Sequence, residues 1–304
     1  MPNFLIVGMC RCGTTSLYHY LKEHPDVFLS RVKEPSFFLA QSLPVPEKGI
    51  GDDARDYYRD LDEYARLFEK SEGCLAVGEA SADNLYHADK VIPHIHKHLG
   101  DPKIIISLRD PVERAFSAYT YLISERREFL PFEEGLAQEE KRRQGGWRHI
   151  WFYKEAGLYF RCVKAYLENF SRVKVCLFDD LKAKPGPLVQ DLYRFLGVDP
   201  SFVPDVTVRY KTSGMPRSQT INRLFEEPTP LRSLARAVGT LLLKEDGWIK
   251  WRDRLKARSY AQAEMKPETR ACLEAAFHDD IIKLQGLIGR DLSAWLGSGD
   301  KDGS

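Results

Sequence analysis

The stretch that decides the fold is Asn3–Thr15, which reads NFLIVGMCRCGTT. Its first part, Asn3–Met9, is a short apolar run that predicts a buried strand. Thr14–His24 is predicted to be a helix, because three of its apolar residues have the i, i+3, i+4 spacing of one helix face: Leu17, Tyr20 and Leu21. A buried strand, a glycine-containing turn and a helix in succession are typical of the first unit of an open α/β sheet.

The rest of the chain alternates in the same way. Four further apolar runs are predicted strands, namely Val27–Leu29, Cys74–Ala80, Lys103–Leu108 and Lys174–Phe178. Helices are predicted at Tyr57–Glu69, Pro111–Arg126, Tyr159–Phe170, Leu188–Leu196 and Thr269–Leu287. Strands that alternate with helices imply right-handed βαβ units and a parallel sheet. We therefore expect one α/β domain over residues 1–304, with a central parallel sheet flanked by helices.

The composition argues against several classes of protein. Of the 304 residues, 43% are hydrophobic and 29% are charged, and the formal net charge is +1. This composition is too apolar for a disordered chain, and the near-neutral charge argues against general nucleic-acid binding. No stretch approaches the roughly 18 consecutive apolar residues of a membrane span, and no secretory signal is evident. Six scattered cysteines favour a cytoplasmic location with reduced thiols.

One segment differs in charge from the rest of the chain. Residues 209–258 contain 12 Lys and Arg against 5 acidic residues, a net charge of +7. The segment is predicted to be partly helical. It is either a solvated amphipathic surface or an insertion beside a binding site, as a lid, as a binding surface for an anionic glycan, or as a peripheral membrane contact.

The turn Gly8–Thr15 has the features of an anion-binding loop. Gly13 lets an anion approach the backbone, where the N–H groups from Cys12 to Ser16 would point at it with the aid of the helix dipole. Further donors come from one guanidinium and three hydroxyls, on Arg11, Thr14, Thr15 and Ser16. The alternative is a strand–turn–helix connection that binds no ligand.

The spacing from Gly8 to Gly13 also matches the phosphate loop of nucleotide triphosphatases. That motif requires a lysine followed by Ser or Thr after the second glycine, and Thr14-Thr15 stands there instead. The lysine that reaches the β- and γ-phosphates is missing, as is the hydroxyl placement that holds Mg²⁺. An anion fits this loop better than a metal-bound triphosphate, although a P-loop kinase or nucleotide triphosphatase remains an alternative.

A second anion-binding segment is predicted where the strand Lys103–Leu108 ends. Arg109 follows that strand directly, and Ser117 lies two helical turns further on. Together they could hold a second phosphate of a ligand with two separated anionic groups. The alternative is that Arg109 pairs with an acidic residue such as Glu113. Asp110 and Pro111 mark the start of the helix, and Glu113 completes a pattern similar to a capping box.

Metal ligands are weakly represented in the sequence. Cys10 and Cys12 have no second cysteine or histidine pair at ligand spacing, and the histidines of His94–His98 (HIHKH) would share a face only on a strand. We expect no metal site.

The two anion-binding segments together resemble those of the sulfotransferases that use 3′-phosphoadenosine 5′-phosphosulfate (PAPS). The first is similar to their 5′-phosphosulfate loop and the second to their 3′-phosphate motif. Within that superfamily the chain is most similar to the heparan sulfate type. The resemblance continues, in order, through Leu21–Val27, Lys33–Phe38, Gly78–Ser81, Gly157–Tyr159, Phe195–Val198, Ile288–Arg290 and Trp295.

The sequence also departs from the heparan sulfate type. Those enzymes carry lysine where Arg11 stands, whereas tyrosylprotein sulfotransferases carry arginine. In those enzymes a lysine commonly follows the catalytic glutamate, whereas Ala80 stands at that position here. They also contain a loop closed by a disulfide bond, which has no counterpart in this sequence. These features resemble a soluble, bacterial type of enzyme.

The resemblance implies in-line transfer of a sulfuryl group from PAPS to a hydroxyl or amine, with adenosine 3′,5′-bisphosphate as the product and no metal required. It assigns catalytic roles to Glu79 as the base, Arg11 at the leaving phosphate and Lys33 at the sulfuryl oxygens. Donor binding falls to Arg11, Cys12, Gly13, Thr14, Thr15, Ser16, Arg109 and Ser117. Glu34 is the competing base, and Glu79 could instead be an ion-pair partner of Arg11.

The acceptor is expected to be a carbohydrate or glycoconjugate. A lipid or polyketide hydroxyl and a tyrosine remain alternatives, as does a non-catalytic binding protein on the same fold. The sequence does not indicate an oligomeric state.

Overall fold

The computed structural model describes residues 1–43, 47–52, 56–207, 215–216, 260–261 and 265–297. The chain divides into two compact units. The first comprises Met1–Tyr119, Leu130–Lys211 and Lys266–Ser304, and it contains the sheet and every site residue expected from the sequence. The second comprises Thr120–Phe129 and Thr212–Met265. The expectation of one domain over residues 1–304 remains a prediction.

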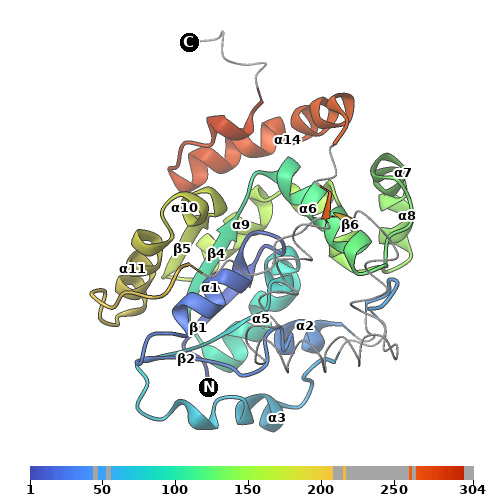
Figure 1. Ribbon diagram of the computed structural model, residues 1–304. Coiled ribbons are helices and arrows are strands. Elements are labelled where there is room, and N and C mark those ends of the chain that lie inside the picture. The colour runs from blue at the N-terminus through green and yellow to red at the C-terminus, as the bar shows by residue number, and fades with distance from the viewer. Residues whose placement is uncertain (44–46, 53–55, 208–214, 217–259, 262–264, 298–304) are drawn as a thin grey trace, which may run out of the picture. The chain divides into compact units, whose positions relative to one another are not determined.

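Five parallel strands form the sheet of the first unit, which confirms the α/β prediction (Figure 1). They are β1 (Phe4–Gly8), β2 (Val27–Leu29), β3 (Ala76–Ala80), β4 (Lys103–Leu108) and β5 (Val173–Leu177). Every residue of β1 and β3 is buried, as expected for strands covered on both faces. All five predicted strands are therefore present: β2 and β4 have the predicted bounds, and the ends of the other three shift by one or two residues.

The strand order β2-β3-β1-β4-β5 places β1 next to the point where the chain reverses its direction across the sheet. The chain runs from β1 through β2 to β3 on one side, and then crosses to β4 on the other side. Ligands of open α/β sheets bind at such a point, beyond the carboxyl ends of the strands. In register, Leu5 of β1 lies between Glu79 of β3 and Ile104 of β4.

Helices cover both faces of the sheet (Figure 1). The helices of the chain up to β4 are α1 (Thr14–Leu21), α2 (Phe37–Ser42), α3 (Leu61–Arg66), α4 (Asp83–Tyr86) and α5 (Ala88–Leu99). Those described after β4 are α6 (Pro111–Ser124), α7 (Phe132–Ala137), α8 (Glu139–Gln144), α9 (Phe160–Asn169), α10 (Phe178–Ala183), α11 (Pro185–Leu196) and α14 (Pro267–Ile288). Short 3-10 helices are η1 (Glu69–Ser71), η2 (His149–Trp151), η3 (Glu155–Gly157) and η4 (Ser293–Trp295).

Two groups of helices form the two outer layers. Helices α1 and α11 pack together on one face, where Leu17, Leu192 and Leu196 join the buried core with Ile6 and Ile105 of the sheet. Helices α4, α5 and α9 lie on the opposite face. Leu5 and Glu79, which are paired in register, point to that face because side chains alternate along a strand and Ile6 and Ala80 belong to the first core. The chain crosses from β1 to β2 and from β3 to β4 in opposite directions, and right-handed crossovers therefore place the connecting helices on opposite faces.

The predicted helix Tyr57–Glu69 differs most from the structure. Helix α3 begins only at Leu61, because the Asp60 carboxylate caps it by accepting a hydrogen bond from the Glu63 N–H at 2.9 Å. It ends at Arg66 and is followed by η1.

Helix α6 begins as the sequence predicts. Asp110 Oδ1 accepts hydrogen bonds from the N–H groups of Val112 and Glu113, at 2.8 and 3.3 Å. Glu113 forms ion pairs with Arg109 and Arg270.

The basic segment 209–258 lies almost entirely outside the described residues. Within it the structure describes Met215–Pro216 (β6), which pairs antiparallel with Tyr260–Ala261 (β7) in the second unit. Its role as an acceptor-side lid remains a prediction. None of the described helices combines the length and apolar character needed to cross a bilayer.

Candidate active site

The loop between β1 and α1 is held in place by backbone and hydroxyl contacts with β4. The Met9 N–H donates to the Ser107 carbonyl at 2.7 Å, and the Ser107 hydroxyl donates to the Cys12 carbonyl at 2.6 Å. Ser107 is almost completely buried. The loop is therefore anchored to the strand that leads to Arg109, so the two predicted anion-binding segments meet at one edge of the sheet.

Gly13 is required at the entry to α1 for two reasons. Its φ of +86° lies in the left-handed region, and a Cβ there would lie 2.8 Å from side-chain atoms of Phe178 and of Leu181 on α10. No side chain caps the N-terminus of α1 among the described residues. The first N–H groups of the helix have no intrahelical partners, and they are therefore available to a ligand.

The hydroxyl groups of the loop differ in exposure. Thr14 is buried, whereas Thr15 and Ser16 are partly exposed. Uncapped amides and adjacent hydroxyls form the kind of donor set that binds phosphate or sulfate oxygens.

Arg11 connects the first segment to the second. Its Nε atom donates a hydrogen bond to the Ser117 hydroxyl on α6 at 3.3 Å, across 106 positions of sequence. Ser117 is buried, and Arg11 is partly exposed. The sequence predicted these residues at separate anionic groups, whereas the structure places them in contact. A guanidinium and a hydroxyl beside an uncapped helix N-terminus therefore converge on one position.

Arg109 faces two partners in the first unit. Its guanidinium lies 3.6 Å from the Glu113 carboxylate, and it also lies over the ring of Phe178, 4.9 Å from the ring centroid. Glu113 accepts a closer contact from Arg270, at 2.6 Å. Arg109 could therefore turn toward an incoming phosphate while Glu113 keeps an ion-pair partner.

Glu79 is completely buried near the end of β3. Its Oε2 accepts a hydrogen bond from the Ser81 hydroxyl at 2.7 Å, while no described residue hydrogen-bonds to Oε1. Burial raises the pKa of Glu79 to about 8; the Ser81 hydrogen bond opposes this shift, and the charge of Glu34 reinforces it. The side chain thus has a perturbed pKa and one buried oxygen that receives no hydrogen bond from the described residues.

The segment from Lys33 to Ser36 lies against the end of β3. The Glu34 N–H donates to the Ala80 carbonyl at 2.9 Å, and Glu34 Oε2 accepts from the Ala82 N–H at 2.9 Å. The Ser36 N–H donates to the Ser81 hydroxyl at 3.0 Å. Lys33 forms an ion pair with the other oxygen of Glu34. Both candidate bases of the sequence analysis are therefore neighbours, and contacts from Lys33 and Ala82 occupy both oxygens of Glu34.

The cysteine pair of the loop is not arranged as a metal site. Cys10 and Cys12 are buried, and burial raises the pKa of the Cys12 thiol to about 12. The Cys12 thiol donates to the Cys10 carbonyl at 3.8 Å. The HIHKH histidines lie on helix α5 and not on a strand, the one setting in which they would share a face.

A buried charged cluster next to this site has no signal in the sequence. Arg148 pairs with Asp83 at 2.7 Å, with Asp52 at 3.5 Å and with Glu47 at 4.0 Å. These residues belong to segments far apart in the chain, and only the fold brings them together. The charge of Asp83 raises the pKa of Glu79 slightly further.

Comparisons with known proteins agree with this geometry. A family model described as "Sulfotransferase family" matches residues 2–202. A sulfotransferase from Alicyclobacillus acidocaldarius, known from a crystal structure, is 36% identical, with a TM-score of 0.76 over 97% of this chain and 98% of that one.

Among curated proteins, mouse carbohydrate sulfotransferase 15 is 30% identical over 45% of this chain and 30% of its own length. Mouse heparan sulfate glucosamine 3-O-sulfotransferase 3A1 is 27% identical over 65% of this chain and 46% of its own length. This chain therefore spans less than half of either of these curated relatives. The family model covers about two thirds of the chain and includes the loop, α6 and Glu79, and on this evidence the chain belongs to the sulfotransferase family.

Proposed function

We propose that this sulfotransferase moves a sulfuryl group from PAPS to a hydroxyl or amine of a carbohydrate or glycoconjugate. The observation that carries the proposal is the contact between Arg11 and Ser117 beside the uncapped N-terminus of α1. This contact brings the guanidinium of Arg11, the hydroxyl of Ser117 and the uncapped amides of α1 together at one edge of the sheet. The strands on either side of β1 place Glu79, near the end of β3, and Arg109, directly after β4, at the same edge.

The donor would be held by the residues of this edge. The N–H groups from Gly13 to Ser16 and the hydroxyls of Thr14, Thr15 and Ser16 would bind oxygens of the 5′-phosphosulfate, with Arg11 and Ser117 on its other side. The Cys12 N–H, which the sequence also suggested as a donor, instead donates to the Met9 carbonyl at 3.2 Å. Arg109 would exchange Glu113 for the 3′-phosphate, leaving Glu113 paired with Arg270. These are the donor types and charges that a ligand with two separated anionic groups requires.

Glu79 would act as the base for the acceptor. Its Oε1, which receives no hydrogen bond from the described residues, would take the proton from the acceptor hydroxyl. At the same time the new bond between the acceptor oxygen and sulfur would form, and the bond between sulfur and the phosphate oxygen would break. Arg11 and the amides of α1 would stabilise the charge that develops on that phosphate oxygen. Because these groups supply the positive charge, the transfer requires no metal ion.

Lys33 would neutralise the negative charge on the sulfuryl oxygens during the transfer, and its flexible side chain could turn from Glu34 to reach them. Glu34 remains the competing base. Both oxygens of Glu34 are already in contact with other groups, whereas Oε1 of Glu79 receives no hydrogen bond from the described residues. This difference favours Glu79 as the base.

The acceptor class rests on the relatives. One is a carbohydrate sulfotransferase and another acts on heparan sulfate glucosamine, according to their names. We also infer a cytoplasmic location, because all six cysteines are free thiols.

Titration calorimetry with adenosine 3′,5′-bisphosphate tests the donor site, and sulfate transfer from PAPS to a panel of oligosaccharides, lipids and tyrosine peptides tests the reaction. We expect binding of the bisphosphate, transfer to a sugar, and loss of transfer in Glu79→Gln with binding retained. The proposal would be contradicted if the folded chain does not bind the bisphosphate, or if it hydrolyses ATP in the presence of Mg²⁺ instead.

A further inference from the structure

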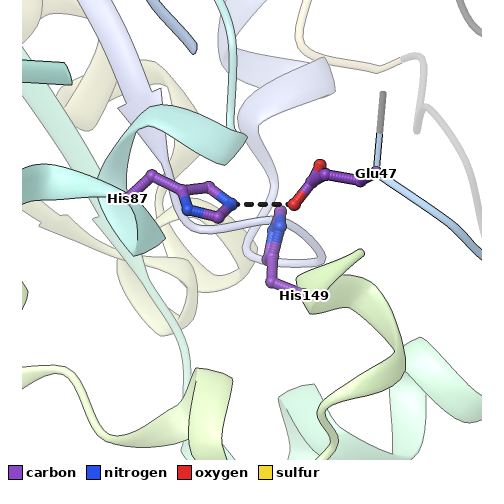
Figure 2. Close-up of side chains that lie close together, drawn as sticks. All are labelled: Glu47, His87 and His149. Atoms are coloured by element: carbon purple, nitrogen blue, oxygen red, sulfur yellow. Dashed lines mark hydrogen bonds and ion pairs between the residues drawn. The ribbon is translucent and has the colours of Figure 1, made fainter. Parts of the chain in front are cut away.

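Three buried side chains outside the proposed active site converge on one point. Glu47 lies between α2 and α3, His87 lies between α4 and α5, and His149 begins η2 (Figure 2). One ligand atom from each side chain lies within 4.8 Å of the other two, and Glu47 Oε1 is 3.0 Å from His87 Nε2. The side chains of Glu47 and His87 are only 8% and 10% exposed, and that of His149 is fully buried.

Backbone contacts hold the Glu47 segment against the His149 segment. The Lys48 N–H donates to the Gly146 carbonyl and the Arg148 N–H donates to the Lys48 carbonyl, each at 2.8 Å. The positions of Glu47 and His149 are therefore fixed relative to each other by main-chain hydrogen bonds.

Ring contacts and a carboxylate orient the two histidines. The His149 ring stacks on Tyr86 with a centroid separation of 5.0 Å, and the His87 ring lies perpendicular to the His149 ring. Asp83 Oδ1 lies 3.6 Å from His149 Nε2. A carboxylate beside a histidine ring is the usual companion of a metal-bound imidazole, because it fixes the orientation of the ring.

The charge of this pocket favours an added cation. Arg148 forms ion pairs with three buried carboxylates, those of Glu47, Asp52 and Asp83. The second oxygen of Glu47 accepts no hydrogen bond from the described residues, and its contact with Arg148 is long, at 4.0 Å. A divalent ion beside this oxygen would supply a charged partner that the described residues hold only at that long distance, and a buried carboxylate is costly without such a partner.

We propose that Glu47, His87 and His149 bind one divalent transition-metal ion of the Zn²⁺ type. Two imidazoles and one carboxylate form a donor set that suits zinc and its first-row neighbours better than Mg²⁺ or Ca²⁺, which prefer oxygen ligands alone. Three protein ligands leave a fourth tetrahedral position for water or a small ligand. The ion would cross-link three segments that are distant in the chain and would stabilise the fold. The proposal is independent of the donor site, since none of its ligands belongs to the proposed catalytic set.

The test uses the full chain stripped of metal with a chelator and titrated with Zn²⁺ alone. We expect one Zn²⁺ per chain with a micromolar or tighter Kd, and a rise in Tm of the order of 5 °C at saturating metal. Substitution of Co²⁺ should give the visible d–d bands of tetrahedral nitrogen and oxygen coordination, without a thiolate charge-transfer band, which separates this site from the six free cysteines.

Variants assign the site to these residues. His87→Ala and the near-isosteric Glu47→Gln should each weaken Zn²⁺ binding by roughly tenfold or more. His94→Ala, on the neighbouring α5 and outside the cluster, should bind as the unmodified chain does and controls for surface histidines. The proposal is overturned if the folded chain binds no stoichiometric Zn²⁺, if the Co²⁺ spectrum shows thiolate ligation, or if both ligand variants keep the affinity of His94→Ala.

Discussion

Replacing Glu79 by glutamine should make the protein more stable at neutral and alkaline pH while removing its activity. Glutamine has nearly the shape of a protonated glutamate, and its carbonyl oxygen can still accept the hydrogen bond from Ser81. It does not carry the negative charge that the completely buried site disfavours. The variant therefore separates the energetic cost of ionising Glu79 from the packing of the strand end.

The size of the effect follows from the shift in pKa. Burial raises the pKa of Glu79 from 4.5 to about 8, so the folded chain holds this proton over a pH range in which the unfolded chain has lost it. The stability that the neutral group contributes is fully present below pH 4.5 and is lost as pH rises through 8. At 1.36 kcal/mol per unit, the unmodified chain loses about 3 kcal/mol by pH 7 and approaches a loss of about 5 kcal/mol above pH 8.

Urea unfolding at pH 5, 6, 7 and 8.5 measures the free energy of unfolding of both chains. The difference should be small at pH 5 and should grow by several kcal/mol in favour of Glu79→Gln by pH 8.5. Glu69→Gln, at an exposed position on η1, controls for the loss of a carboxylate as such. A difference between Glu79→Gln and the unmodified chain that stays constant over this range would refute the reasoning.

Other perturbations address the donor loop, the 3′-phosphate contact and the base. Arg11→Ala should reduce kcat/KM for PAPS by about 10²-fold or more, with partial recovery in Arg11→Lys; a loss below threefold would contradict its role. Arg109→Ala should weaken binding of adenosine 3′,5′-bisphosphate far more than binding of adenosine 5′-monophosphate, as calorimetry can show; equal losses would remove its assignment. Gly13→Ala should lower the free energy of unfolding in urea by about 2–4 kcal/mol, because the added Cβ collides with Phe178 and Leu181 and the left-handed backbone disfavours a side chain. Gly73→Ala is the control: its φ is +84° and an added Cβ meets open space, so it should show only the backbone cost. In the unmodified chain kcat/KM should rise with pH up to about 8 and then level off, since only ionised Glu79 can accept a proton; a profile that is flat from pH 6 to 8 would point to another base.

The central strands of the sheet were predictable because they are largely apolar. Lys103–Leu108 and the runs around Phe4 and Ala76 are buried on both faces, which leaves a continuous hydrophobic signal. The short helices α2, α4, α7, α8 and α10 were not predicted, since four to six residues span less than two helical turns and give the apolar pattern no room to repeat. The twelve-residue helix α5 was also not predicted. Helix α11 begins at Pro185, earlier than predicted, with proline in its first turn.

The residues of the candidate site could be chosen from the sequence, but their contacts could not. Both anion-binding segments carry local signals, namely glycine, hydroxyls and arginine at the end of a strand. The hydrogen bond from Arg11 to Ser117 depends on the adjacency of β1 and β4, which no local pattern encodes. The cluster of Glu47, His87 and His149 could not be predicted at all, since each residue lies in a separate stretch of the sequence with no other member of the cluster nearby.

The structure also changes the relation between the two glutamates that compete as base in the sequence. Glu34 lies on a segment whose main chain and side chain bond to Ala80 and Ala82, on either side of the Ser81 hydroxyl that holds Glu79. This segment helps to exclude water from Glu79, and its negative charge adds to the rise in the Glu79 pKa that burial causes. Glu34 is thus better explained as part of the environment that tunes the base than as a second base. Glu34→Gln should then lower the pH at which kcat/KM levels off, since one cause of the raised Glu79 pKa is removed, without abolishing transfer. Loss of transfer in Glu34→Gln together with its retention in Glu79→Gln would reverse the two roles.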